Sequence, residues 1–77
     1  MASEEALAYA QAALTASEEG GTVIERAWAH LDLGGAYRLH DQLDEAEEHL
    51  QAALAAGEQT GELMLQGMCL TFLSIVY

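Results

Sequence analysis

The sequence repeats itself at a spacing of forty residues, and this spacing constrains the fold more than any single residue does. When residues 1–37 are aligned on residues 41–77 without a gap, eleven positions are identical. A fixed period of this size is typical of helical-repeat proteins, in which each unit buries its apolar face against its neighbours. The identical pairs are Glu5/Glu45, Ala6/Ala46, Gln11/Gln51, Ala12/Ala52, Ala13/Ala53, Leu14/Leu54, Ala16/Ala56, Glu18/Glu58, Gly21/Gly61, Leu33/Leu73 and Tyr37/Tyr77.

The composition favours helix along the whole repeat. Proline is absent, while Ala, Leu, Glu and Gln, which are good helix formers, are abundant. We therefore predict an all-α fold of antiparallel helix hairpins. The four expected helices cover about residues 3–19, 23–39, 42–57 and 61–77.

The expected helices divide the chain into one complete repeat and two partial ones. Residues 1–20 correspond to the second helix of a preceding repeat, residues 21–60 form one complete repeat, and residues 61–77 correspond to the first helix of a following repeat. The chain therefore resembles a fragment of a longer array that is cut out of phase with its repeat.

Start and stop signals set the expected helix boundaries. The glycine pair at residues 20–21 should end the first helix, since glycine accepts the left-handed conformation found after helices. Thr22 and Glu25 have the spacing of a capping box at the start of the second helix. We expect Asp41 to cap the third helix and Thr60 to cap the fourth.

The fourth expected helix is apolar around nearly its whole circumference, whereas the third has one apolar stripe. A helix that is apolar on every side should be buried on every side, and no helix follows it in the sequence. We therefore predict a homodimer in which the fourth helices pack together or exchange. The candidates for self-association are Leu65, Met68, Phe72, Ile75 and Val76.

The charge balance excludes two classes of partner. The chain has thirteen acidic residues against Arg26 and Arg38, with a formal net charge of −11. Nucleic-acid phosphates and anionic membranes both require clustered Lys or Arg, so we expect neither as a partner. A protein or peptide partner is expected, and a basic one would complement this charge.

The sequence contains no targeting or membrane-spanning signal. Residues 1–20 lack the basic start and apolar centre of a signal peptide. The uncharged stretch at residues 63–77 is shorter than the ~20 residues that a membrane-spanning helix needs. We expect a cytoplasmic location.

The segment 27–53, AWAHLDLGGAYRLHDQLDEAEEHLQAA, resembles the tetratricopeptide repeat family. The resemblance implies helix–turn–helix units stacked into a right-handed superhelix with a concave groove that binds peptides. It also implies that small residues lie where the helices of a unit cross, with larger side chains around them. The matching repeat-packing residues are Leu33, Gly34, Tyr37, Ala46, Leu50 and Ala53.

Two departures distinguish this chain from the common form of the family. Its period is forty residues, while the usual tetratricopeptide period is about 34. This spacing is similar to the long form found in large bacterial regulators, signalling ATPases and some scaffolds. The proline that often ends a unit is also missing, and Glu58 lies near its place. In the second copy Ser74 stands where the first copy has glycine.

Trp28 and Arg38 are the candidates for contact with a peptide in the implied groove. Aromatic residues often anchor interfaces. The alternative for Trp28 is a half-buried structural role, which is the more common place for Trp in a small helical domain.

No residue pattern predicts catalysis, a metal or a cofactor. Glu45 and His49 lie four residues apart on one helix, with His40 in the preceding turn, but a solvated Glu–His pair is common without metal. The adjacent carboxylates on the helices point apart and stay solvated, whereas acid–base catalysis needs a shifted pKa in a pocket. We expect no enzymatic activity.

These observations predict a protein–protein interaction module from a larger regulatory or scaffold protein. It would bind a peptide or helix between stacked helices and self-associate through its C-terminal helix. Two alternatives stay open. The chain could be the effector-sensing or oligomerisation segment of a bacterial transcriptional activator whose DNA-binding part lies elsewhere, or a designed or truncated folding model without a natural partner.

Overall fold

Four α-helices account for almost all of residues 2–76, the part of the chain that this computed structural model describes, and no strand lies among those residues. The side chains are described from Glu4 to Val76. The predicted all-α fold is confirmed. The helices are α1 (Ala2–Gly20), α2 (Val23–Leu39), α3 (Leu43–Thr60) and α4 (Leu63–Val76).

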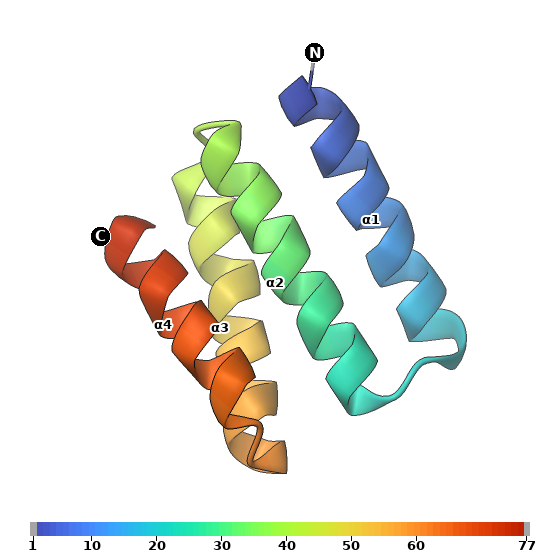
Figure 1. The fold of residues 1–77 in the computed structure, drawn as a ribbon. Coiled ribbons are helices and arrows are strands. Elements are labelled where there is room, and N and C mark those ends of the chain that lie inside the picture. The colour runs from blue at the N-terminus through green and yellow to red at the C-terminus, as the bar shows by residue number, and fades with distance from the viewer. Residues whose placement is uncertain (1, 77) are drawn as a thin grey trace.

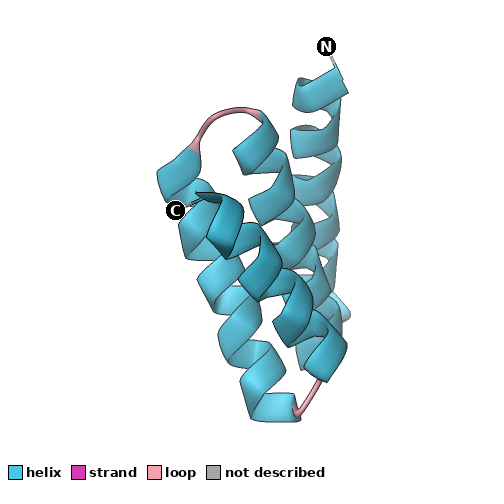
Figure 2. Ribbon diagram, turned by 60° about the vertical axis from the view of Figure 1, so that its left-hand side comes forward, coloured by secondary structure: helices cyan, strands magenta, loops and turns pink. Residues whose placement is uncertain are grey.

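Successive helices run antiparallel and pack as neighbouring hairpins (Figure 1). Helix α2 is central: α1 lies along one side of it, and α3 lies behind α2 and α4 in this view. The loops at the two ends of α3 are short (Figure 2). The molecule measures 35 × 30 × 17 Å, and because a helix with its side chains is about 10–12 Å wide, each helix keeps one side near the surface.

The first two boundary signals lie where the sequence predicts them. Helix α1 ends at Gly20, the first glycine of the pair, but neither Gly20 nor Gly21 has the left-handed backbone that the prediction assumed. The backbone N–H of Glu25 donates to the Thr22 hydroxyl over 3.1 Å, and the backbone N–H of Thr22 donates to the Glu25 carboxylate over 3.0 Å. The hydrogen bond that the Thr22 backbone N–H donates to the Glu25 carboxylate lowers the pKa of Glu25, and the Thr22 side chain adds to this effect. The capping box is confirmed and fixes the start of α2.

The predicted caps of α3 and α4 are wrong. Asp41 has a left-handed backbone, with φ 61°, and ends α2: its N–H donates to the Arg38 carbonyl and that of Gln42 donates to the Tyr37 carbonyl. This pair of hydrogen bonds is the Schellman motif, in which Asp can replace glycine. Gln42 therefore precedes α3, without a side-chain cap.

Helix α3 is longer than predicted because Gly57 does not end it. Gly57 is buried inside the helix, where a Cβ atom would lie 3.1 Å from Cγ of Gln66. The left-handed residue is Gly61, with φ 78°. Thr60 consequently lies in the last turn of α3, where its hydroxyl donates to the Ala56 carbonyl over 2.8 Å, and it does not cap α4.

Two apolar clusters hold the helices together. The larger joins α2, α3 and α4 and includes Leu31, Leu50, Leu65 and Cys69, all of them fully or almost fully buried. The same burial raises the pKa of the Cys69 thiol. The smaller joins α1 to α2 through Ala10, Leu33 and Ala36, with Leu7, Leu14 and Tyr37 around them. Helix α1 is thus attached by smaller side chains than α4.

Helices α2 and α3 approach closely at Gly34. A Cβ atom there would lie 2.7 Å from Cγ of Leu50 and 3.3 Å from the Ala46 carbonyl oxygen. Glycine at this position lets α2 and α3 pack with the Leu50 side chain between them. The adjacent Gly35 has more room, since its nearest neighbour would be an atom of Phe72 at 3.9 Å.

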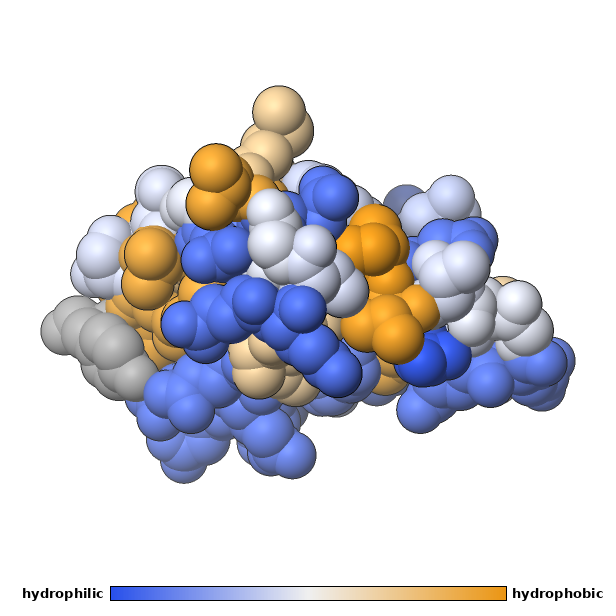
Figure 3. Space-filling model, turned by 90° about the horizontal axis from the view of Figure 1, so that it is seen from below, coloured by the Kyte–Doolittle hydropathy of each residue, from blue (hydrophilic) through white to orange (hydrophobic). Residues whose placement is uncertain are grey.

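Within this single chain helix α4 is buried on one side only, and burial of its other sides by a second copy stays a prediction. Leu65, Cys69 and Leu73 face the core. On its other sides, Leu63 is 79% and Met64 is 72% exposed. The space-filling view in Figure 3 shows apolar patches at the surface, divided by hydrophilic side chains. Of the helices described, none has the length and apolar character needed to cross a membrane.

Candidate interaction groove

A cavity of about 690 Å³ lies where α1, α2 and α4 face one another. Its walls are mostly apolar, and its charged side chains are Glu5, Asp32 and Arg38. Because α1 and α4 flank α2 without packing against each other, their facing sides leave this hollow over α2. The other lining residues are Ala6, Tyr9, Ala10, Leu31, Gly35, Ala36, Leu39, Met68 and Phe72.

Residues that the sequence assigned to two different roles meet in this cavity. Arg38 was a groove candidate, while Met68 and Phe72 were candidates for self-association, and the structure brings the three together. The guanidinium carbon of Arg38 lies 5.6 Å from the centre of the Phe72 ring, within the range of a cation–π contact. Nε of Arg38 is buried without a hydrogen-bond partner.

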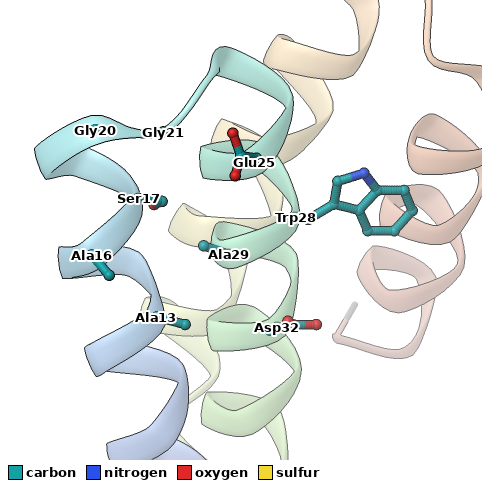
Figure 4. A pocket seen from close by; sticks show the side chains of 9 residues that line it. All are labelled: Ala13, Ala16, Ser17, Gly20, Gly21, Glu25, Trp28, Ala29 and Asp32. Atoms are coloured by element: carbon teal, nitrogen blue, oxygen red, sulfur yellow. The ribbon is translucent and has the colours of Figure 1, made fainter.

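Trp28 lies beside a second cavity, of about 580 Å³, between α1 and α2 (Figure 4). Small residues of α1, including Ala13 and Ala16, form one wall. The Trp28 ring points away from α1 and toward α4 (Figure 4), and it packs against the larger apolar cluster. Its half-buried position fits the structural role that the sequence left open.

Asp32 lines both cavities and points to the same side of α2 as Trp28 (Figure 4). Its side chain is exposed at the mouth of the groove. Desolvation by the surrounding protein raises the pKa of this carboxyl group. Sequence reasoning missed Asp32. The only available signal was its spacing of one helical turn from Trp28, with Gly35 and Leu39 continuing the same stripe.

The three self-association candidates that do not line the groove differ in their burial. Leu65 is fully buried inside the chain, so it is corrected from a surface candidate to a core residue. Val76 is half-buried against the larger cluster. Ile75 is 56% exposed and remains available. The sequence also missed Leu63 and Leu70, which are 79% and 56% exposed, because an all-apolar helix carries no period that marks its buried side.

The repeat-packing residues lie at two interfaces rather than one. Ala46, Leu50 and Ala53 are fully buried on α3. Ala53 belongs to the cluster shared with α4. Leu33 and Tyr37 instead pack toward α1.

The histidines pair in a way that the sequence did not predict. Nδ1 of His30 on α2 lies 2.9 Å from Nδ1 of His49 on α3, and the His49 ring also stacks on Tyr37. Desolvation lowers the pKa of His30, with smaller lowering effects of His49 and Arg26 and an opposing effect of Glu18.

The spacing of Glu45 and His49 did not predict a metal site. Within the described residues, no group of three or more His, Cys, Asp or Glu side chains could hold a metal ion. The His30–His49 contact connects the two helices of one hairpin instead.

Comparisons with models of known protein families, with characterised proteins and with solved structures find no match to this chain.

Proposed function

We propose that this chain is a protein-interaction module of the tetratricopeptide type, which binds a peptide or helix from its partner in the groove between α1, α2 and α4. The observation that carries the proposal is the cavity of about 690 Å³, which combines apolar walls with a few charged side chains. This volume lies within the roughly 300–1,000 Å³ typical of binding pockets.

The groove suits a partner that presents side chains along an extended or helical segment. Its walls come from three helices, so the groove loses little conformational entropy when a partner binds. Tyr9, Leu39 and Met68 line it and are 79%, 62% and 39% exposed. Apolar side chains exposed together in a hollow are the usual contact of a helix-in-groove complex. Such a module would act in a larger regulatory or scaffold protein.

A groove-filling variant tests this function. Peptides would be selected from a random library on the intact chain, and their affinities measured by calorimetry. Gly35→Leu should abolish binding, because a Cβ atom at this position meets only Phe72, at 3.9 Å, and the longer side chain would extend into the cavity. Ala52→Leu, at an exposed position of α3, is the matched control and should bind normally. Equal binding by both variants would refute the groove.

A second proposal concerns self-association through α4. It is favoured by the exposure of Leu63, Met64, Leu70 and Ile75. Fully burying one such side chain contributes about 1.5–3 kcal/mol, so several together favour association. We expect a homodimer at micromolar concentration by analytical ultracentrifugation, and a monomer for the double variant Leu70→Ser, Ile75→Ser. A folded monomeric wild-type chain under the same conditions contradicts this proposal.

A further inference from the structure

The charges that face the groove are unbalanced. Glu5 and Asp32 line it together with one cation, Arg38, and Arg38 already lies against the Phe72 ring. In the neighbouring cavity the acidic residues are Glu25 and Asp32, and the Glu25 carboxylate accepts the backbone N–H of Thr22. Asp32 is therefore the acid shared by both cavities and not used in capping a helix.

The surroundings of Asp32 also favour a cation. Its carboxyl group is partly desolvated, and it forms no ion pair with the residues that the structure describes. An unpaired carboxylate in such a place gains more from an incoming cation than a fully solvated one does, because water screens the pair less. The apolar side chains of Leu39 and Met68 line the same groove.

We propose that the groove selects a basic peptide segment, and that a Lys or Arg side chain of the partner lies with its charge at Asp32 and its aliphatic stem against Leu39 and Met68. This inference rests on the proposed function and names the chemistry of the partner. Long basic side chains commonly cover apolar surface with their stems while their charged ends stay in a polar environment.

The charge of the whole chain argues for the same occupant. A net charge of −11 repels nucleic acids and anionic lipids. A basic peptide is attracted at long range, and this attraction weakens as salt is added. Asp32 adds a local contact in the groove, which the long-range attraction between the chain and a basic peptide does not provide.

Three designed peptides of equal length test the inference. Each would be an amphipathic helix with leucines on one face, and the other face would carry Lys, Gln or Glu. Affinities would be measured by fluorescence anisotropy at 0.05 and 0.3 M NaCl. We expect the Lys peptide to bind more tightly than the Gln peptide, with a preference that shrinks at high salt, and the Glu peptide to bind most weakly.

Asp32→Asn removes the charge and keeps the side-chain shape. It should weaken binding of the Lys peptide about three- to tenfold at low salt and leave the Gln peptide unchanged. Glu48→Gln, at an exposed position of α3, changes the net charge equally and should have less than a twofold effect. Circular dichroism should show both variants fully folded, since Asp32 and Glu48 are both exposed.

The outcomes separate this inference from the proposed function. Equal losses in the Asp32→Asn and Glu48→Gln variants would overturn the inference, because bulk charge would then explain the preference. If the Gln and Lys peptides bind equally tightly and Gly35→Leu abolishes both, the groove stands and the basic preference fails. If Gly35→Leu abolishes neither, the proposed function fails as well.

Discussion

Helices α2 and α4 hold equivalent positions in the forty-residue repeat, yet the structure buries them to different extents. Helix α2 has six buried residues, with neighbours on two sides. Helix α4 has three, although it is the more apolar of the two. The position of Leu31 in α2, which is 1% exposed, corresponds to that of Thr71 in α4, which is exposed.

The difference teaches that burial depends on the number of neighbours as well as on the sequence of the helix. Helix α2 packs between α1 and α3, so its apolar residues contribute to the stability of the fold. Helix α4 packs mainly on α3 and keeps apolar side chains in water. Exposed apolar patches of this kind usually mark interaction surfaces. The groove lies where α2, which is packed on two sides, faces α4, which is packed mainly on one.

The largest expected effect comes from truncating one leucine on α2 and one on α4 and comparing the two losses of stability. Leu31→Ala should lower the free energy of unfolding by about 2–5 kcal/mol, because it leaves a cavity in the larger cluster. Leu70→Ala should change it by less than about 0.5 kcal/mol. Urea unfolding followed by circular dichroism in dilute solution, where copies stay apart, measures both. Similar losses in the two variants would mean that α4 is as well covered as α2.

Adjacent glycines of α2 sharpen the contrast between a packed side and a groove side. Gly34→Ala should destabilise the fold by about 1–3 kcal/mol, since the added Cβ would meet Leu50 at 2.7 Å. Gly35→Ala, which faces the groove, should stabilise it by about 0.5–1 kcal/mol, because alanine loses less backbone entropy in a helix. Thermal unfolding gives both values. The same sign for the two variants would contradict the close α2–α3 approach.

The smallest expected effect is on the pH dependence of folding stability. A histidine of α2 contributes to it, and the equivalent position of α4 holds no histidine. His30 of α2 contacts His49, whereas the equivalent residue of α4 is Leu70. The pKa of His30 lies below its ordinary value of 6.5 in the folded chain, so the unfolded chain binds more protons between those two values. The stability contributed by neutral His30 is complete above pH 6.5 and is lost as the pH falls through the folded-state pKa.

Unfolding in urea at a series of pH values between 7.5 and 5.5 measures this effect. The wild-type chain should lose stability across the range, and His30→Gln should lose less. His40→Gln, in the exposed turn after α2, is the control and should behave like the wild type. An unchanged pH dependence in His30→Gln would show that the histidine contact does not couple to folding.

The sequence was sufficient for the helices because their signals are local. The Thr22–Glu25 capping box and the repeat spacing depend on residues close in the chain or related by a fixed period. Asp41 was misassigned because the same side chain suits a helix cap and a left-handed turn, and only the backbone distinguishes them.

The groove was harder to predict because it depends on contacts between helices. Arg38 lines the cavity, but its neighbours Met68 and Phe72 lie some thirty residues away in the sequence and belong to another helix. Asp32 looks like any exposed helix acid until α1 and α4 flank it. The buried side of α4, formed by Leu65, Cys69 and Leu73, could not be inferred from the sequence, because the helix is apolar on its other sides as well.

Nuclear magnetic resonance of the labelled chain during titration with a selected peptide tests the central claim most directly. The account predicts that the backbone amide signals of Asp32, Gly35, Arg38 and Met68, which line the groove, shift together and saturate at one peptide per chain. Shifts centred instead on His30, His49 and the outer side of α3, with the groove signals unchanged, would contradict it.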